Sequence, residues 1–131
     1  MTTKQKGNIA LTSAIKYFDN NNWTVLIPLN DSQDYDLAFE DNDGKIKKVQ
    51  CKYTSCKAGV NKDKFIVKLY VCGHRDKNGN NYCKFYKEGS IDYFFIETEN
   101  NDKYLIPYED VKHLKSYTIN ESSNKYLIKI K

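Results

Sequence analysis

The chain has 131 residues, of which 40% are hydrophobic and 29% are charged, and it contains 11 Tyr and 6 Phe. This length allows one substantial core, and the aromatic content argues against a disordered chain and for a folded domain containing a β-sheet. No apolar run approaches the roughly 18–20 residues of a membrane helix. The first residues, MTTKQKGNIA, have no apolar signal core. We therefore expect a single cytoplasmic domain over residues 1–131.

The net charge of +4 is unevenly distributed along the chain. Residues 1–43 carry 3 Lys/Arg and 7 Asp/Glu, residues 44–91 carry 12 and 3, and residues 92–131 carry 6 and 7. A basic middle segment between mildly acidic ends favours a face that binds a polyanion. The alternative is a lysine-rich surface that is only solvated.

The pattern of residues 2–19 predicts a helix. Thr2 and Gln5 have the spacing of a capping box. The expected buried stripe follows the i, i+3, i+4, i+7 spacing and consists of Leu11, Ala14, Ile15 and Phe18. Three asparagines, residues 20–22, are expected to end the helix, because Asn tolerates the left-handed conformation.

Strand patterns follow the helix. Expected strands are Trp23–Ile27, Asp34–Glu40, Ile46–Tyr53, Phe65–Val71, Tyr82–Tyr86, Asp92–Glu97, Tyr104–Pro107 and Tyr126–Ile130. Residues 54–64 and 73–81 are expected to be loops, and residues 108–114 a short helix. Together these elements predict an α/β (α+β) domain in which helices flank a sheet.

The hairpin formed by residues 34–40 and 46–53 has one favourable register. If Asp36 lies opposite Gln50, the apolar faces of the two strands coincide and so do the polar faces. Asp36, Gln50 and Lys52 then share one side, with opposite Cβ atoms on the order of 5 Å apart. That spacing is close enough for Asp36 and Gln50 to flank a single metal ion.

An acid opposite a Gln-x-Lys pair has the chemistry that phosphodiester hydrolysis requires. Mg²⁺ prefers oxygen ligands, usually one or two carboxylates and several waters. Asp36 offers a carboxylate, while the Gln50 side chain and the Cys51 backbone carbonyl offer two neutral oxygens. Lys52 would orient water or offset phosphate charge. Taken singly, such residues on a strand usually form only a solvated face.

These residues belong to a longer pattern. In chain order the segments are KGNIA (6–10), VLIPLND (25–31), YDL (35–37), VQCK (49–52), DYFFI (92–96) and YLIP (104–107). This pattern resembles the PD-(D/E)xK nuclease superfamily, most closely its group I intron-type homing endonuclease branch and that branch's small phage and bacterial relatives. The resemblance covers most of residues 6–111.

The resemblance implies a restriction-endonuclease-like core with a mixed central β-sheet flanked by helices. It also implies Mg²⁺-dependent cleavage of DNA, and we expect Mn²⁺ to be able to replace Mg²⁺. The superfamily's second acid is Gln50 in this chain, as in the intron-encoded branch. That branch usually has a Glu on its first helix where this chain has Leu11, which leaves Asp36 as the one sure carboxylate.

Expected DNA contacts lie in the loops beside the predicted site. The candidates for phosphate binding are Lys57, Lys62, Lys64, Arg75 and Lys77. Gln33, just before the Asp36 strand, is expected to contact substrate near the metal. Tyr82, Phe85 and Tyr86 either stack on bases or, as is commoner for aromatic residues in short strands, belong to the core.

The cysteines at positions 51, 56, 72 and 83 match no usual zinc spacing. We expect reduced thiols, with Cys51 on the core side of its strand. A zinc cluster of Cys72, His74 and Cys83, in a zinc-stabilised interaction domain, is the minor alternative.

The sequence therefore predicts a metal-dependent DNA endonuclease, of homing, Holliday-junction-resolving or phage-type nicking kind. A subunit this small usually pairs to cut both strands, so we expect a homodimer or homotetramer. The alternative function is a catalytically weakened DNA-binding module that retains the nuclease fold.

Overall fold

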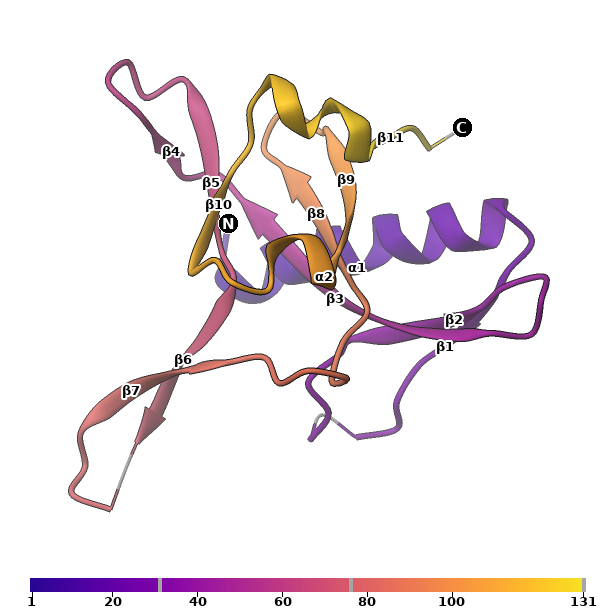
Figure 1. Cartoon of the computed structure of the whole chain (residues 1–131), viewed down its shortest axis with the longest axis horizontal. Coiled ribbons are helices and arrows are strands. Elements are labelled where there is room, and N and C mark those ends of the chain that lie inside the picture. Colours follow the sequence, from indigo (N-terminus) through magenta and orange to yellow (C-terminus); the bar gives the residue numbers. More distant parts are fainter. Residues whose placement is uncertain (31, 76, 131) are drawn as a thin grey trace.

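The computed structural model describes residues 1–30, 32–75 and 77–130, and within these the side chains of residues 71–75 and 81–83 lie outside the description (Figure 1). The helices are α1 (Thr3–Asn20), α2 (Tyr108–Val111) and the 3₁₀ helix η1 (Glu121–Tyr126). The strands are β1 (Thr24–Leu26), β2 (Leu37–Glu40), β3 (Ile46–Thr54), β4 (Lys57–Ala58), β5 (Lys64–Lys68), β6 (Tyr70–Arg75), β7 (Asn81–Phe85), β8 (Tyr93–Thr98), β9 (Lys103–Pro107), β10 (Ser116–Thr118) and β11 (Leu127–Ile128).

A six-stranded sheet in the order β1-β2-β3-β8-β9-β11 forms the centre of the molecule. Its β3–β8 pair is parallel, whereas the other neighbouring strands are antiparallel. This sheet, with α1 lying along it in Figure 1, confirms the predicted mixed sheet with flanking helices. A three-stranded sheet (β10-β5-β4) and a two-stranded sheet (β6-β7) complete the described strands.

Helix α1 begins and ends much as its sequence predicts. The capping box is present, because the Gln5 N–H donates to Thr2 Oγ1 (3.1 Å) and the Thr2 N–H donates to Gln5 Oε1 (2.7 Å). After the helix, Asn22 has a φ of 62°, the left-handed conformation expected of this asparagine run. Ala14 and Phe18 are buried as predicted, but Ile15 is 36% exposed. Ala10 is also buried, so the fully buried stripe is Ala10, Ala14 and Phe18, with Leu11 partly buried beside it.

Two apolar clusters lie on opposite faces of the six-stranded sheet. The first, here called the α1 cluster, consists of Ala10, Ala14, Phe18, Leu37, Phe39, Val49, Cys51 and Phe95. Within it, the ring centroids of Phe18 and Phe39 are 4.4 Å apart. The second, here called the opposite cluster, joins β8 and β9 to β5, α2 and β10 through residues that include Phe94, Ile96, Phe65 and Tyr108. Strand β8 contributes to both clusters, so it is covered on both sides.

Several predicted boundaries change because short strands pair with distant partners. β2 begins at Leu37 rather than at residue 34, since residues 34–36 leave the β3 ladder. The strand predicted over residues 65–71 is divided between β5 and β6, which belong to different sheets. The connecting Leu69 N–H donates to the Lys115 carbonyl (2.9 Å).

Other predicted loops and ends are also corrected. Residues 54–64, predicted to be a loop, contain β4, which pairs with β5. Residues 73–81, the other predicted loop, contain the turn and the strand ends of the β6–β7 hairpin. The sequence pattern did not predict β10 or η1, and the predicted closing strand is reduced to β11. The β8–β9 hairpin is confirmed, whereas α2 ends at Val111, three residues earlier than expected.

Two hairpins, β4–β5 and β6–β7, extend from the left side of the molecule in Figure 1. They carry most of the lysines predicted to contact DNA. Across the described residues, no helix is long and apolar enough to cross a membrane.

Candidate active site

Asp36 lies at the point where β2 and β3 separate. The ladder pairs Leu37 with Val49, which is the predicted register. One residue before the ladder, the Asp36 N–H donates to the Val49 carbonyl (2.9 Å) and its Oδ2 accepts from the Cys51 N–H (2.9 Å). Two backbone contacts therefore fix Asp36 beside the part of β3 that β2 does not cover.

Gln50 and Lys52 lie on one face of β3. In the parallel β3–β8 pair, Gln50 is opposite Phe94 and Lys52 is opposite Ile96, and both partners belong to the opposite cluster. Cys51 is opposite Phe95 and packs in the α1 cluster. The strand thus points Gln50 and Lys52 away from α1, as the alternation predicted.

The backbone of Cys51 faces the Asp36 side of β3. Its N–H donates to Asp36 rather than to β8, and the N–H and C=O of one residue in a strand point the same way. The Cys51 carbonyl is therefore directed to the opening between β2 and β3. This direction fits the predicted role of this carbonyl as a neutral metal ligand.

The Asp36 carboxyl and the Lys52 ammonium influence each other electrostatically. Desolvation raises the pKa of Asp36, while the Cys51 N–H and the charge of Lys52 lower it. Desolvation lowers the pKa of Lys52, while the charge of Asp36 raises it. Desolvated groups of opposite charge at a strand opening are typical of sites that act on charged substrates. A metal ion or a phosphate would offset the cost of keeping them there.

Tyr86 completes the wall of this site, and the sequence analysis did not predict that role. The Lys52 Nζ lies 5.3 Å from the Tyr86 ring centroid, within the range of a cation–π contact. The ring also meets Phe94 edge-on, with centroids 5.5 Å apart. Burial raises the pKa of Tyr86 well above its usual value, and the charges of Asp36 and Asp34 raise it further.

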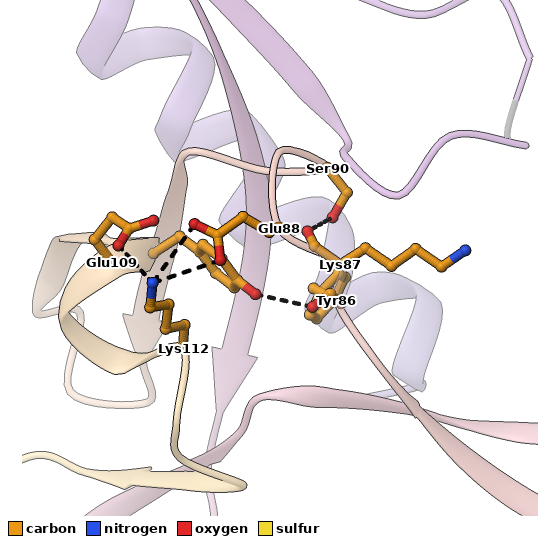
Figure 2. A network of polar contacts seen from close by, with 7 residues as sticks. Tyr86, Lys87, Glu88, Ser90, Glu109 and Lys112 are labelled. Carbon is orange, nitrogen blue, oxygen red and sulfur yellow. Dashed lines mark hydrogen bonds and ion pairs between the residues drawn. The ribbon is translucent and has the colours of Figure 1, made fainter.

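A network of contacts holds the segment that carries Tyr86, as Figure 2 shows. The Tyr108 hydroxyl of α2 donates to the Tyr86 carbonyl (2.9 Å). The Lys112 Nζ lies 3.4 Å from a Glu88 oxygen and 2.8 Å from a Glu109 oxygen. Contacts with α2 and with Lys112 thus hold residues 86–88 in place, and with them the Tyr86 ring that contacts Lys52. This link between distant segments leaves no local pattern in the sequence.

The oxygen donors around Asp36 fit a hard cation such as Mg²⁺. Within the described part of the chain, Asp36 Oδ1 makes no hydrogen bond, so one carboxylate oxygen is available. Gln50 and the Cys51 carbonyl lie on the same stretch of β3. One carboxylate with neutral oxygens and water is a usual Mg²⁺ environment. Among the described residues, no group of three or more His, Cys, Asp or Glu side chains could hold a metal, so water would supply the other ligands.

Two cavities flank the site. One, of about 290 Å³, is lined by Asp36 and Gln33 together with residues 28–30 and Tyr35. Gln33 and Asp36 thus line the same cavity, and contact of Gln33 with substrate stays a prediction. The other, of about 540 Å³, is lined by Lys52 and by the start of α1.

Leu11 lies on the α1 side of the sheet. It is partly buried and packs against the α1 cluster. Gln50 and Lys52 point to the other face, so Leu11 does not join their face. Asp34 is a second acid near the site, because its charge acts on Tyr86, and its Oδ1 lies 4.0 Å from Lys84 Nζ. Asp31 lies outside the described residues.

The residues predicted to bind DNA are divided between the two projecting hairpins. Lys57, Lys62 and Lys64 are exposed on the β4–β5 hairpin, and Lys77 is exposed in the β6–β7 turn. Arg75 ends β6, but its side chain is outside the described part. These residues are therefore separate from the Asp36 opening rather than part of it.

The residues considered for base stacking differ in exposure. Phe85 is 48% exposed, Tyr86 is a core residue, and the Tyr82 side chain lies outside the described part. Of these three residues, only Phe85 therefore has a described ring that is exposed.

The cysteines show a buried and an exposed thiol. Cys51 is buried on the core side as predicted, and burial raises the pKa of its thiol well above 9.0. Cys56 is an exposed free thiol. The side chains of the possible zinc ligands, Cys72, His74 and Cys83, lie outside the described residues.

An acid at a strand opening beside Gln-x-Lys on a mixed sheet is the architecture of one nuclease class. A sequence profile of the PD-(D/E)XK endonuclease family matches residues 1–127, and the chain belongs to this family. Among solved structures it is similar to the bacterial homing endonuclease I-Ssp6803I. The two share 25% identity with a TM-score of 0.82, over 97% of this chain and 89% of that chain. None of the curated proteins compared with the chain matches it. The family and the restriction-endonuclease-like fold are thus confirmed.

Proposed function

We propose that this nuclease is a divalent-metal-dependent DNA endonuclease in which Asp36, Gln50 and Lys52 form the catalytic site. The observation that carries the proposal is the place of the Asp36 carboxyl, which lies at the β2–β3 opening and accepts from the Cys51 N–H next to Lys52 on β3. Membership of the PD-(D/E)XK family and the similarity to a homing endonuclease support DNA as the substrate.

Each residue has a distinct part in this proposal. Asp36, the Gln50 side-chain oxygen and the Cys51 carbonyl would hold Mg²⁺, and Mn²⁺ would be able to replace it. The bound ion would offset charge on the scissile phosphate and lower the pKa of a coordinated water. Lys52 orients water or offsets phosphate charge, and Tyr86 beneath it limits where its ammonium lies. Gln33, in the neighbouring cavity, contacts the substrate beside the metal.

We further propose that the β4–β5 and β6–β7 hairpins hold the DNA backbone and that the protein acts as a homodimer or homotetramer. The first part rests on the exposed Lys57, Lys62, Lys64 and Lys77 and on Arg75. The second rests on the small size of the subunit, because one site cuts one strand. Sedimentation of the purified protein would measure the number of subunits.

The decisive experiment incubates the protein with supercoiled plasmid and with a four-way junction, in Mg²⁺, Mn²⁺ or EDTA. We expect metal-dependent cutting that Asp36→Ala and Lys52→Ala each abolish. Asp43→Ala and Lys45→Ala are matched controls, because both residues are exposed in the β2–β3 turn, and they should cut normally. Cutting by either site variant at the wild-type rate would refute the assignment. Preference for plasmid or junction would decide between a nicking or homing role and a resolving one.

Leu11 favours one alternative, a catalytically weakened DNA-binding module. An apolar side chain packs where the related branch usually has Glu, so the site relies on a single sure carboxylate. In that case the protein would bind DNA and cut neither substrate with any of the metals.

A further inference from the structure

The cavity of about 540 Å³ beside Lys52 has no role in the proposed chemistry. Its walls come from separate parts of the chain: the first turn of α1, the end of β3, β5 and the start of β10. Lys6 and Thr3 line it from α1, and Lys52 and Ser55 line it from β3 and the residue that follows. Lys6 belongs to the KGNIA segment, whose polar residues the proposed site does not use.

The charge in this cavity is of one sign. Lys6, Lys52 and Lys68 all line it, and none of the described residues lining it carries a carboxylate. Within the described part of the chain, Lys6 forms no ion pair, and its Nζ donates one hydrogen bond, to Ser55 Oγ (3.1 Å). An ammonium group has three N–H donors, so Lys6 has donors left for an anion. The charge of Asp36 acts on Lys52, and Lys68 is exposed to solvent, so Lys6 is the partly buried cation of this cavity that has no acidic partner among the described residues.

The position of the cavity indicates which kind of anion would bind there. Residue 52 belongs both to the lining of the cavity and to the proposed cutting site, so the two adjoin at the same stretch of β3. A DNA strand bound at Asp36 carries further phosphates on either side of the one being cut. A volume of about 540 Å³ is within the usual range of small-ligand sites, roughly 300–1,000 Å³, and accommodates a phosphate with its sugar.

We propose that this cavity is a subsite for a backbone phosphate that flanks the scissile phosphate, bound by Lys6 with Ser55 holding the ammonium in place. The proposal rests on the proposed function, because DNA at Asp36 defines which phosphate reaches the cavity. It makes Lys6 a substrate-binding residue at the site itself, apart from the lysines of the two hairpins.

The test compares Lys6→Gln with Lys4→Gln and Lys6→Arg. Lys4 is exposed two residues earlier on α1 and does not line the cavity, so Lys4→Gln is a matched removal of charge. Fluorescence anisotropy of labelled duplex DNA in EDTA measures affinity without cutting. We expect Lys6→Gln to weaken binding about tenfold, as for the removal of one charged hydrogen bond. The slope of log affinity against log salt concentration should be smaller for Lys6→Gln than for the wild type by roughly 0.9, the value for one phosphate contact. Lys4→Gln should change neither quantity by as much, and Lys6→Arg should recover most of the affinity.

A second measurement locates the contact. Duplexes with a neutral methylphosphonate at one phosphate on either side of the mapped cut should bind the wild type more weakly at one of the two positions. At that position Lys6→Gln should show no further weakening, because the two changes remove the same contact.

The outcomes separate the two proposals. Equal binding by Lys6→Gln and Lys4→Gln in a protein that cuts DNA overturns the subsite and leaves the nuclease function standing. Binding that depends on Lys6 in a protein that never cuts overturns the catalytic function and, with it, the subsite as defined here, and leaves Lys6 as a DNA-binding residue only. A protein that neither binds nor cuts DNA overturns both.

Discussion

Asp36 is held by the Cys51 N–H and by the charge of Lys52, yet desolvation outweighs both and raises its pKa above the usual 3.8. Well below pH 3.8 the carboxyl is protonated in the folded and unfolded chains alike, so it contributes nothing to the difference in stability. Between 3.8 and the raised value, the unfolded chain ionises first. The free energy of unfolding therefore falls as pH rises through this window. Ionised Asp36 therefore lowers the stability of the fold, as expected of a residue with the proposed metal-binding role.

We accordingly expect Asp36→Asn to melt at a higher temperature than the wild type near pH 7. The difference should shrink toward pH 3, because the neutral amide resembles a protonated carboxyl. Thermal melting at both pH values measures this, with Asp43→Asn as the control for an exposed turn acid. A stability gain that is the same at both pH values would contradict the assigned cause.

At the scale of elements, α1 depends on its first turn. The reciprocal Thr2–Gln5 bonds satisfy two backbone N–H groups that the helix itself leaves unpaired. This turn also places Lys6 beside Ser55. Order in the first turn therefore matters both to stability and to the proposed phosphate subsite.

Thr2→Ala should lower the free energy of unfolding by about 1 kcal/mol, the usual cost of removing such a cap. Thr12→Ala makes the same chemical change at an exposed position inside α1, where Ala is the better helix former, and should not destabilise. Urea denaturation of the two variants gives the comparison. Equal destabilisation by both would show that the cap has no special contribution.

For the whole molecule, the basic middle of the sequence becomes two projecting hairpins beside a site on the central sheet (Figure 1). In the proposed function, charge carried on these hairpins would contact phosphates away from the cutting site. Binding of this kind releases counterions, so affinity should fall steeply as salt rises.

Changing Lys57, Lys62 and Lys64 together to Gln should make DNA binding less sensitive to salt. The slope of log affinity against log salt should fall by roughly 0.9 for each of these lysines that neutralises a phosphate. A matched triple change at the exposed Lys16, Lys115 and Lys129 alters the net charge equally but lies outside the hairpin. Affinity measured over a salt series compares the two. Equal effects would mean that net charge, not this hairpin, governs binding.

Local sequence pattern was sufficient to specify the β2–β3 register and the alternation of Gln50 and Lys52 with Cys51 along β3. A strand alternates its side chains with a period of two, so only one register joins apolar to apolar residues. The α1 cap and the left-handed Asn22 followed for the same reason, since each depends on neighbours within a few residues. The family pattern rested on such local segments, and the matching profile confirms it.

Long-range packing, by contrast, put Tyr86 beneath Lys52, joined Lys6 to Ser55 and placed Leu11 on the other side of the sheet. It also divided residues 64–75 between two sheets and formed β10, which pairs with β5 from about 50 residues away. These contacts join segments far apart in the chain, and no periodicity within either segment specifies the partner. Local pattern in the sequence thus determined the register around Asp36 and Lys52, while the folded chain determined what surrounds them.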